Sequence, residues 1–358
     1  MRVLQLIDSL NAGGAERMAV NYANALATRL EGSFLCATRK EGLLKASISK
    51  DVEYLFLNRK KTIDITAIKR LSTFVKEHHI DVIHAHATSF FLATLVKILN
   101  PKLVLVWHDH YGNSEFLENR PLFVLKKCSR WFNYIITVNT NLEAWAKNNL
   151  LNTPVAYLPN FAQVTSSKQQ TTLKGVKNKR IVCLANLRPQ KDHLNLLKAF
   201  KKVLKKHSEW TLHLLGKDFQ DDYATEIKGF ISKNNLEENI FLYGSCTDVN
   251  HILRQGDIGV LASKSEGLPL ALLEYGLAKL AVVATQVGDC HKVISTEDEG
   301  LLVAPKHPEA LAQAIATYIE NENLRVVAAE NLNAKVLSEF SETGVIEVLI
   351  TIYNSNKP

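Results

Sequence analysis

Short apolar runs alternate along the chain with longer segments in which apolar residues recur at helical spacing. The first run, residues 3–7, is followed by an apolar-periodic segment that ends near Leu30. Similar runs recur at 34–38, 53–57, 81–86, 102–107, 134–139 and 155–158. Strands of a parallel sheet are buried on both faces and therefore read as continuous apolar runs. The alternation predicts an α/β fold with doubly wound parallel sheets.

A change of composition divides the chain into two such series. Residues 163–179 are rich in Ser, Thr, Gln and Lys and lack an apolar period, which is typical of a linker. Strand-like runs resume at 180–184, 211–215, 240–243, 257–262 and 281–285. With 358 residues, 46% of them hydrophobic, the chain is long enough for two domains with their own cores. We expect a first domain at 1–165 and a second at 166–340.

Two carboxylates stand at the start of one predicted helix, in the segment 265–274 between the runs 257–262 and 281–285. Pro269 suits the first helical position, and Glu266 and Glu274 lie before and inside the helix. The free N–H groups at such a helix start carry partial positive charge and suit a phosphate group. A helix cap for Glu266 and a solvated face for Glu274 are the structural alternatives.

Other strand-to-helix loops carry glycines, cations or imidazoles. Gly13 and Gly14 let the backbone approach a ligand, although a plain turn explains them equally well. Arg188 and Lys191 follow the strand at 180–184, where a diphosphate would need neutralising. His84 and His86 share one strand face; a metal pair is conceivable there, but we favour a role in lining a cleft.

The net charge of +7 lies entirely in the first part of the chain. Residues 1–165 hold 20 Lys and Arg against 13 Asp and Glu, whereas residues 166–358 hold 23 of each. Without a nucleic-acid-binding motif, this excess favours an anionic membrane or a phosphorylated substrate as the partner. The amphipathic basic segment 121–132 fits a membrane-surface helix and, nearly as well, a packing helix with a solvated face.

The five cysteines are scattered and odd in number, which indicates a reduced, cytoplasmic compartment and no zinc site. No apolar run reaches the length of about 18 residues that a membrane span needs. We therefore expect a cytoplasmic protein, with the inner face of the cell membrane as a site of peripheral contact if the segment 121–132 docks there.

Several motifs together resemble the retaining glycosyltransferases of family 4, which have the GT-B fold. Glu266-Gly267-Leu268-Pro269, followed by Glu274 eight residues after the first Glu, is similar to their Glu-x7-Glu signature. The loop from Gly13 to Arg17, the strand-end His108 and the turn at Asn160 also resemble family motifs. The resemblance implies two facing Rossmann-like domains with a cleft between them, and a terminal helix, about 341–358, that joins the first domain.

The resemblance also implies the site residues. The catalytic group would be Glu266, His108 and Lys191. Donor binding would fall to Arg188, Lys191, Glu274, Gly267, Leu268, Pro269, Gly216, Thr247 and Asp248. The acceptor side of the cleft would hold Gly13, Gly14, Glu16, Arg17, His84, His86 and Asn160. Asn186 occupies the family's usual Arg position, which leaves the role of Arg188 in doubt; for Asp248, a helix cap is an equal alternative.

The implied activity is transfer of a sugar from a nucleotide-diphosphate sugar, with UDP as the expected nucleotide, to a glycan or lipid-linked acceptor in cell-surface polysaccharide synthesis. No Asp-x-Asp motif is present, so we expect no metal and no other cofactor. Nucleic acid is not expected as a partner. A sugar-nucleotide epimerase of GT-B fold and a non-catalytic glycan-binding protein on the same scaffold remain as alternatives.

Overall fold

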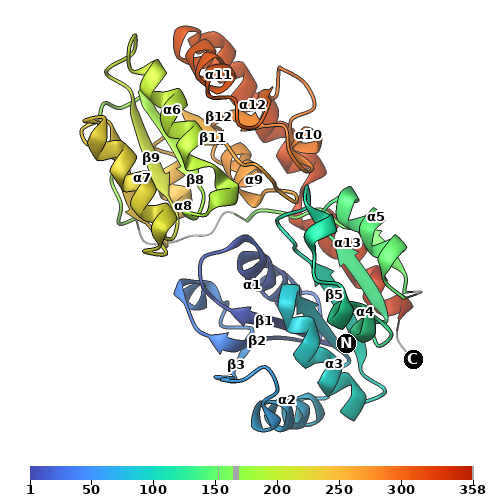
Figure 1. Cartoon of the computed structure of the whole chain (residues 1–358). Helices are drawn as coiled ribbons and strands as arrows, with labels where there is room; N and C mark the ends of the chain where they lie inside the picture. Colours follow the sequence, from blue (N-terminus) through green and yellow to red (C-terminus); the bar gives the residue numbers. More distant parts are fainter. Residues whose placement is uncertain (152, 164–168, 357–358) are drawn as a thin grey trace. The chain divides into compact units, whose positions relative to one another are not determined.

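The computed structural model describes residues 1–151, 153–163 and 169–356, and the chain forms two compact units (Figure 1). The first unit comprises Met1–Phe161 together with Glu342–Pro358, and the second comprises Ala162–Ser341. The terminal helix α13 (Glu342–Ser355) thus belongs to the first unit. Part of the predicted linker, residues 164–168, lies outside the described residues.

The first unit is built on a seven-stranded parallel sheet with the order β3-β2-β1-β4-β5-β6-β7. Its strands are β1 (Arg2–Ser9), β2 (Gly32–Lys40), β3 (Glu53–Phe56), β4 (Val82–His86), β5 (Val104–Asp109), β6 (Tyr134–Thr137) and β7 (Val155–Tyr157). The helices of its N-terminal segment are α1 (Gly14–Ala27), α2 (Ile65–Glu77), α3 (Phe90–Leu99), α4 (Phe123–Ser129) and α5 (Thr140–Asn149). Apolar clusters around Leu6 and Leu35 lie on the sheet and bury the central strands.

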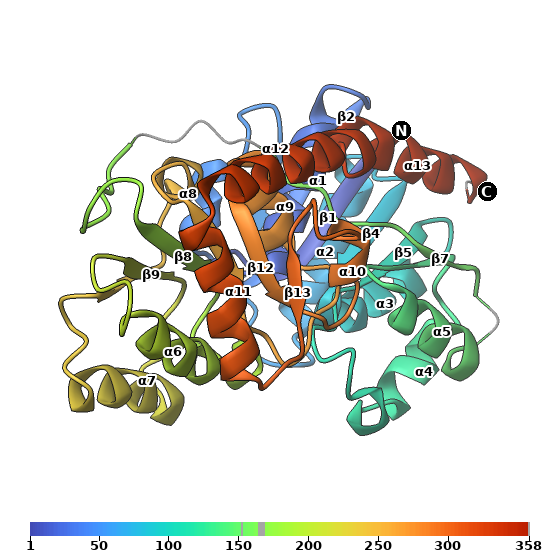
Figure 2. The same ribbon diagram turned by 90° about the horizontal axis from the view of Figure 1, so that it is seen from above.

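The second unit contains a six-stranded parallel sheet with the order β10-β9-β8-β11-β12-β13. Its strands are β8 (Arg180–Leu184), β9 (Thr211–Leu215), β10 (Ile240–Gly244), β11 (Ile258–Leu261), β12 (Ala281–Thr285) and β13 (Leu301–Val303). Its helices are α6 (His193–Val203), α7 (Asp222–Lys233), α8 (Val249–Leu253), α9 (Leu270–Leu277), α10 (Cys290–Val293), α11 (Pro308–Glu320) and α12 (Glu322–Glu339). Helices α6 and α11 lie side by side in this unit (Figure 2), and α12 packs on α9.

The predicted doubly wound parallel organisation is confirmed in each unit, since every strand pair is parallel. The start of α9 differs by one residue from the prediction, because Pro269 is its N-cap, with extended backbone, rather than its first helical residue. Helix α9 is also buried on more than one stripe: Leu272, Leu273 and Tyr275 are all inaccessible.

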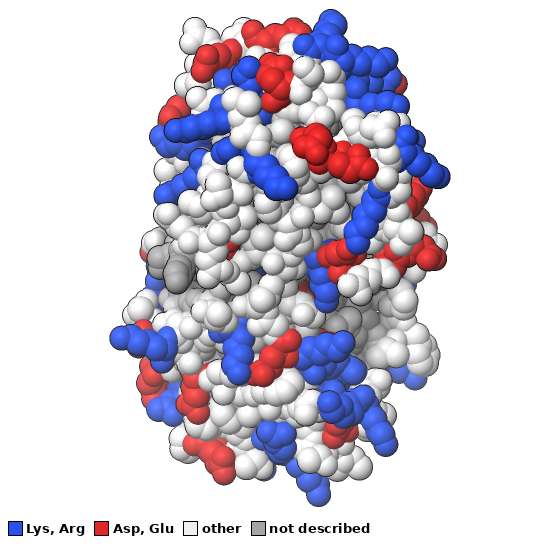
Figure 3. Space-filling model, turned by 90° about the vertical axis from the view of Figure 1, so that its left-hand side faces the viewer, with Lys and Arg blue, Asp and Glu red and all other residues white. Residues whose placement is uncertain are grey.

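None of the helices in the described residues is long and apolar enough to cross a membrane. On the face shown in Figure 3, Lys and Arg side chains are interspersed with Asp and Glu rather than gathered into one basic patch.

Candidate functional site

The loops that follow β8 and β11 are joined at the carboxyl edge of the second sheet, because these two strands pair directly. The backbone N–H of Lys264 donates to the carbonyl of Gln190 at 2.7 Å. The Lys264 ammonium also forms an ion pair with Asp192 at 3.2 Å. Ligands of open parallel sheets bind at such an edge, so the residues carried by these two loops form our candidate donor site.

Lys191 and Glu266 meet within this pair of loops, although they are 75 positions apart in the sequence. The Lys191 Nζ lies 2.6 Å from the Glu266 Oε1, and the Ser263 hydroxyl donates to the same oxygen at 2.6 Å. The Glu266 side chain is 6% exposed and that of Lys191 is 21% exposed. The structure thus holds a carboxylate and an ammonium in a fixed pair at the predicted site.

The entrance to α9 is fixed by backbone contacts from the loop after β12. Gly288 has a φ of +51°, and a Cβ there would lie 2.2 Å from the Glu266 carbonyl oxygen, so the close approach requires glycine. The Asp289 N–H donates to the Gly267 carbonyl at 2.9 Å. Leu268 is buried, and Pro269 leads into the helix without a side-chain cap. The helix N-terminus therefore has a defined position next to Glu266.

Glu274 lies on the second turn of α9, with a relative exposure of 7%. The following residue, Tyr275, locks this helix onto the sheet: its hydroxyl accepts from the Leu184 N–H at 2.7 Å and donates to the Val260 carbonyl at 3.2 Å. The Tyr275 ring rests against Gly259, where a Cβ would lie 2.7 Å from it. The burial of Glu274 contradicts the alternative of a solvated face, and Glu266 pairs with Lys191 and accepts from Ser263, contacts that a helix cap alone would not require.

Arg188 and Gly216 lie at the neighbouring strand ends. The Arg188 guanidinium is 4.8 Å from the centre of the Phe219 ring, and the side chain is exposed. Asn186, at the family's usual Arg position, accepts from the Lys217 N–H at 2.7 Å and so shapes the loop after β9. Gly216 has a φ of +152°, and a Cβ there would lie 2.1 Å from the Ala185 carbonyl oxygen. Gly216 is thus required for the close approach of these two loops.

A cavity of about 360 Å³ opens beside Gly216 at the ends of β8, β9 and β10. It is lined by Ala185, Leu187, Leu214, Gly216, Asp218, Lys228, Leu242, Tyr243 and Gly244. Its lining combines apolar side chains with the polar groups of Asp218, Lys228 and Tyr243.

Thr247 and Asp248, predicted on the donor side, have different environments. Thr247 is exposed, whereas Asp248 is buried. The Asp248 carboxylate accepts from the N–H groups of Gln170 and Thr171, both at 2.8 Å, and it does not cap α8. These bonds tie the second part of the predicted linker to the start of α8, and they account for the depressed pKa of Asp248 against the opposing effect of burial. A donor contact for either residue stays a prediction.

In the first unit, the predicted glycine loop forms the start of α1, with Gly13 as its N-cap. The Glu16 carboxylate folds back over Gly13, where a Cβ would lie 2.3 Å from it, and accepts from the Ser9 hydroxyl at 3.1 Å. Gly14 is exposed, Arg17 is half-buried, and Asn160 is buried in the turn after β7. The structure places Gly13, Gly14 and Glu16 together, at the carboxyl end of β1.

His84, His86 and His108 lie together on β4 and β5 and are fully buried. One nitrogen of each lies within 4.8 Å of the others, a spacing that three imidazole ligands of a metal could adopt. Hydrogen bonds already join these rings to one another and to neighbouring side chains, as described below. Burial lowers the pKa of all three rings well below the usual value, so they are neutral.

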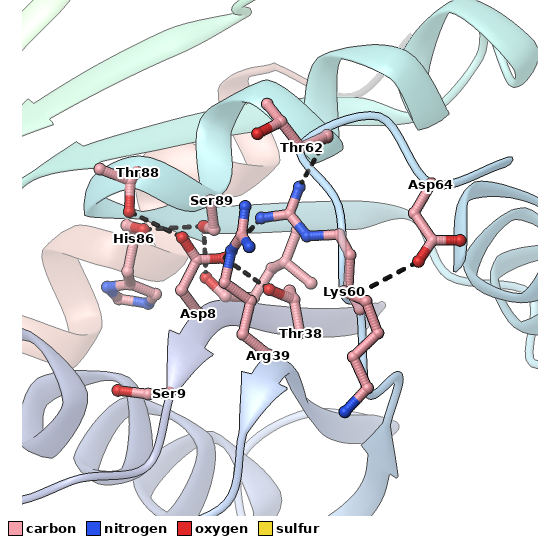
Figure 4. Close-up of polar contacts among 12 residues, drawn as sticks. Asp8, Ser9, Thr38, Arg39, Lys60, Thr62, Asp64, His86, Thr88 and Ser89 are labelled. Atoms are coloured by element: carbon pink, nitrogen blue, oxygen red, sulfur yellow. Dashed lines mark hydrogen bonds and ion pairs between the residues drawn. The ribbon is translucent and has the colours of Figure 1, made fainter. Parts of the chain in front are cut away.

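Asp8 binds together four segments at the carboxyl edge of the first sheet, a cluster that the sequence did not indicate (Figure 4). Its carboxylate accepts from the hydroxyls of Thr38 and Thr88, at 2.5 and 2.7 Å, and from the Arg59 guanidinium at 3.0 Å. The Arg39 guanidinium lies 3.9 Å away. Two guanidiniums thus face the Asp8 carboxylate, and Asp64 also acts on Arg59.

Sequence reasoning missed further residues that hold the predicted ones in place. Ser263 precedes Glu266 by three positions, a spacing that could have suggested its contact. His110 follows His108 by two positions and stacks on it, with ring centres 4.1 Å apart. Tyr353, by contrast, contacts His84 from the terminal helix, and the local sequence does not predict that contact.

Comparisons with known proteins agree with this architecture over most of the chain. Residues 12–164 match the family model "Glycosyltransferase Family 4", and residues 165–334 match "Glycosyl transferases group 1". The structure is similar to that of Anabaena Alr3699/HepE in complex with UDP, with a TM-score of 0.79 and 19% identity, covering 99% of this chain and 100% of that chain. That likeness supports the fold.

Two relatives show the range of similar sequences. The lipopolysaccharide core biosynthesis mannosyltransferase LpcC of Rhizobium leguminosarum bv. viciae is 29% identical over 184 residues, which is 51% of this chain and 52% of that protein. The UDP-Gal:alpha-D-GlcNAc-diphosphoundecaprenol alpha-1,3-galactosyltransferase of Escherichia coli is 20% identical over 316 residues, 81% of this chain and 79% of that protein. With both family models matched and the fold in agreement, the chain belongs to the group 1 glycosyltransferases of GT-B fold.

Proposed function

We propose that this glycosyltransferase moves a sugar from a nucleotide-diphosphate sugar to a hydroxyl of a glycan or lipid-linked acceptor, with retention of anomeric configuration and without a metal. The observation that carries the proposal is the contact between Lys191 and Glu266 at the entrance to α9, with Glu274 one helix turn further on. A cation, a helix N-terminus and two carboxylates at one sheet edge match the chemical demands of a sugar-nucleotide donor.

Each group has a distinct role in this proposal. An ammonium has three N–H donors, so Lys191 can bond Glu266 and a diphosphate oxygen together. Lys191 and the start of α9 would stabilise the charge that develops on the departing diphosphate, the task that a metal performs in other transferases. Glu274 would accept from the ribose hydroxyls, and Glu266 would face the transferred sugar.

The cavity beside Gly216 is our candidate for the nucleotide base. Leu187, Leu214 and Leu242 provide apolar walls for a planar ring, and Tyr243 provides an aromatic one. The E. coli relative is named as using UDP-Gal and a diphosphoundecaprenol-linked acceptor, and the Rhizobium relative as acting in lipopolysaccharide core biosynthesis. These names support a UDP-sugar donor and a lipid-linked acceptor for this chain.

A panel of nucleotide sugars, assayed in excess EDTA, tests the proposal. We expect at least one donor, with UDP-sugars tried first, to protect the protein against thermal unfolding and to be hydrolysed slowly without an acceptor. Release of an epimerised sugar nucleotide would instead indicate an epimerase, and no binding by any donor would overturn the proposal. Activity that is lost in EDTA and restored by Mg²⁺ would overturn its metal-independent part.

Removing either donor-binding side chain is expected to weaken nucleotide binding. A hydrogen bond to a charged group contributes about 1.5–3 kcal/mol, so Glu274→Ala and Lys191→Ala should each raise the dissociation constant about tenfold to a hundredfold. Calorimetry with UDP measures this directly. Lys202→Ala is a matched control, because Lys202 forms an exposed ion pair with Glu309 at 2.9 Å on the surface of the same unit. Unchanged UDP affinity in both site variants would refute this donor site.

We also propose that the first unit docks reversibly on an anionic membrane through α4 and its flanks, which would bring the site to a lipid-linked acceptor. Phe123, Val124 and Trp131 are exposed, at 71%, 48% and 38%, and they are interspersed with exposed cations. The Lys127 ammonium lies 4.1 Å from the centre of the Phe123 ring. Exposed aromatic side chains beside cations are typical of segments that bind a bilayer surface.

Liposome binding is therefore expected to require anionic lipid and to fall with salt. Each cation near such a surface contributes about 1 kcal/mol, so neutralising Lys126, Lys127 and Arg130 together should weaken binding about a hundredfold. Neutralising Lys201, Lys205 and Lys206 on and after α6 removes the same charge from the second unit and should change binding little. A wild-type protein that ignores anionic liposomes at low salt would show that the segment is an ordinary packing helix.

A further inference from the structure

Four imidazoles form one stack in the first unit, at the ends of β4 and β5. The register of these strands places His86 opposite His108, and His84 and His110 extend the group on either side. The ring centres of His84 and His86 are 4.4 Å apart, and those of His86 and His110 are 5.2 Å apart. His84, His86 and His108 are buried and His110 is half-buried, so the polar atoms of the three buried rings depend on protein partners.

Two side chains outside the stack complete its hydrogen bonds. Tyr353, on α13, lies with its hydroxyl 2.6 Å from the His84 Nδ1, and the His84 Nε2 lies 3.1 Å from the His108 Nδ1. Gln5, on β1, places its Oε1 2.8 Å from the His86 Nε2 and its Nε2 3.4 Å from the Tyr353 hydroxyl. The chain of contacts thus runs from Gln5 through Tyr353 and His84 to His108.

The donors and acceptors in this series of contacts indicate which atom carries each proton. The Gln5 amide N–H donates to the Tyr353 hydroxyl oxygen, and the His84 Nδ1, at 2.6 Å, is an acceptor for the hydroxyl proton, so we assign that proton to this contact. A neutral His84 that accepts at Nδ1 carries its proton on Nε2 and donates it to the His108 Nδ1. His108, also neutral, must then carry its own proton on Nε2.

The last donor of this series, the His108 Nε2–H, has no acceptor within the described residues. The His108 Nε2 is buried and makes no hydrogen bond there, whereas the other ring nitrogen is occupied by His84. A buried N–H left without a partner costs folding free energy, and such groups are rare away from functional positions. A ligand oxygen is the partner that this donor is suited to meet.

We infer that Tyr353 and His84 are positioning residues that hold His108 as the Nε2–H tautomer, with a hydrogen-bond donor ready for an oxygen of a bound substrate. A substrate as its partner rests on the proposed function, whereas the tautomer rests on the contacts of the first unit alone. The inference gives the terminal helix a role in the site. The Tyr353 hydroxyl, on α13, sets which nitrogen of His84 and then of His108 carries the proton, an arrangement that we call the relay.

The chain offers a matched pair of variants. Tyr22 and Tyr353 are both fully buried and both contact the imidazole stack, with the Tyr22 ring centre 5.5 Å from that of His84. The Tyr22 hydroxyl makes no hydrogen bond with the described residues, whereas that of Tyr353 bonds His84. Tyr353→Phe therefore removes the proposed relay, and Tyr22→Phe removes a hydroxyl without altering it.

Nitrogen-15 NMR of the histidine-labelled whole chain in EDTA tests the tautomer, with His108→Asn used to assign the signal. We expect wild-type His108 to show a protonated Nε2 and an unprotonated Nδ1, Tyr22→Phe to show the same, and Tyr353→Phe to shift the ring towards the Nδ1–H tautomer. A wild-type His108 with its proton on Nδ1 would overturn the inference even if Tyr353→Phe failed to fold. An unchanged tautomer in folded Tyr353→Phe would overturn it as well.

Kinetics separates this inference from the proposed function. If a substrate oxygen meets His108, Tyr353→Phe should lower kcat about threefold to tenfold, with the donor KM changed less than twofold and Tyr22→Phe unaffected. A tautomer that shifts in Tyr353→Phe without any loss of kcat would support the relay and refute a substrate contact of His108.

Discussion

Replacing Glu266 by glutamine is expected to lower kcat about 100- to 1,000-fold while UDP affinity changes less than about threefold. Glutamine keeps the shape of the side chain and can still accept from the Ser263 hydroxyl, but it lacks the negative charge. In the proposed reaction, positive charge develops on the transferred sugar as its bond to the diphosphate breaks. A buried carboxylate acts on that charge with little screening by solvent, so its loss affects the transition state more than the bound donor.

Glu299→Gln is the matched control for this experiment. Glu299 pairs with Lys335 at 2.9 Å in the same unit, and its side chain is 19% exposed, so the substitution also neutralises a shielded Lys–Glu pair. We expect Glu299→Gln to change stability and to leave kcat near the wild-type value. Equal losses of kcat in both variants would mean that the Glu266 effect is structural; an unchanged kcat in Glu266→Gln would remove this residue from the reaction.

Arg120→Ala is expected to destabilise the first unit by about 3–5 kcal/mol, because it leaves a carboxylate buried without its cation. The Arg120 guanidinium binds Asp109 through two hydrogen bonds, at 2.6 and 2.8 Å, and the two side chains are 7% and 1% exposed. It also lies 4.3 Å from the centre of the Trp145 ring and 4.5 Å from that of Tyr111. The pair holds the loop after β5, which carries His110.

Urea unfolding followed by tryptophan fluorescence measures the effect, since Trp107 and Trp145 both contact Arg120. The control is Lys147→Ala, which breaks an exposed ion pair with Glu143, at 2.7 Å on α5. Exposed pairs contribute at most about 1 kcal/mol, so this variant should unfold close to the wild type. If Arg120→Ala were no less stable than Lys147→Ala, the buried Arg120–Asp109 pair would not contribute to the free energy of unfolding.

The fold was predictable because each unit repeats one simple pattern. A strand such as β5 is buried on both faces, so its sequence is a continuous apolar run, and the helices between such runs keep their own period. Boundaries were less predictable, as at α9, where proline can stand at the N-cap or at the first helical position. The local sequence does not distinguish these two positions.

The candidate site was predictable in its parts and unpredictable in its contacts. Glu266, Glu274 and Lys191 were recognisable from local motifs, but the meeting of Lys191 with Glu266 depends on β8 and β11 being neighbours in the sheet. These two strands are adjacent in the sheet although they are not consecutive in the sequence, and no local pattern predicts that adjacency. Asp248 illustrates the same limit, since its partners at Gln170 and Thr171 come from a segment without any apolar period.

Contacts made by the terminal helix were the least accessible to sequence reasoning. The resemblance implied that residues 341–358 join the first domain, but nothing in it singled out Tyr353. Its hydroxyl matters only because β1, β4 and β5 bring Gln5, His84 and His108 within reach of α13. Such a network depends on tertiary packing rather than on spacing along the chain.

The most direct test of the central claim, that the loops after β8 and β11 bind the nucleotide, is amide hydrogen exchange of the whole chain with and without saturating UDP. The account predicts slower exchange in residues 186–191 and 264–274, with the effect at 264–274 reduced in Glu274→Ala at the same UDP concentration. Protection confined to residues 1–161, or no protection anywhere under conditions in which calorimetry shows UDP bound, would contradict it.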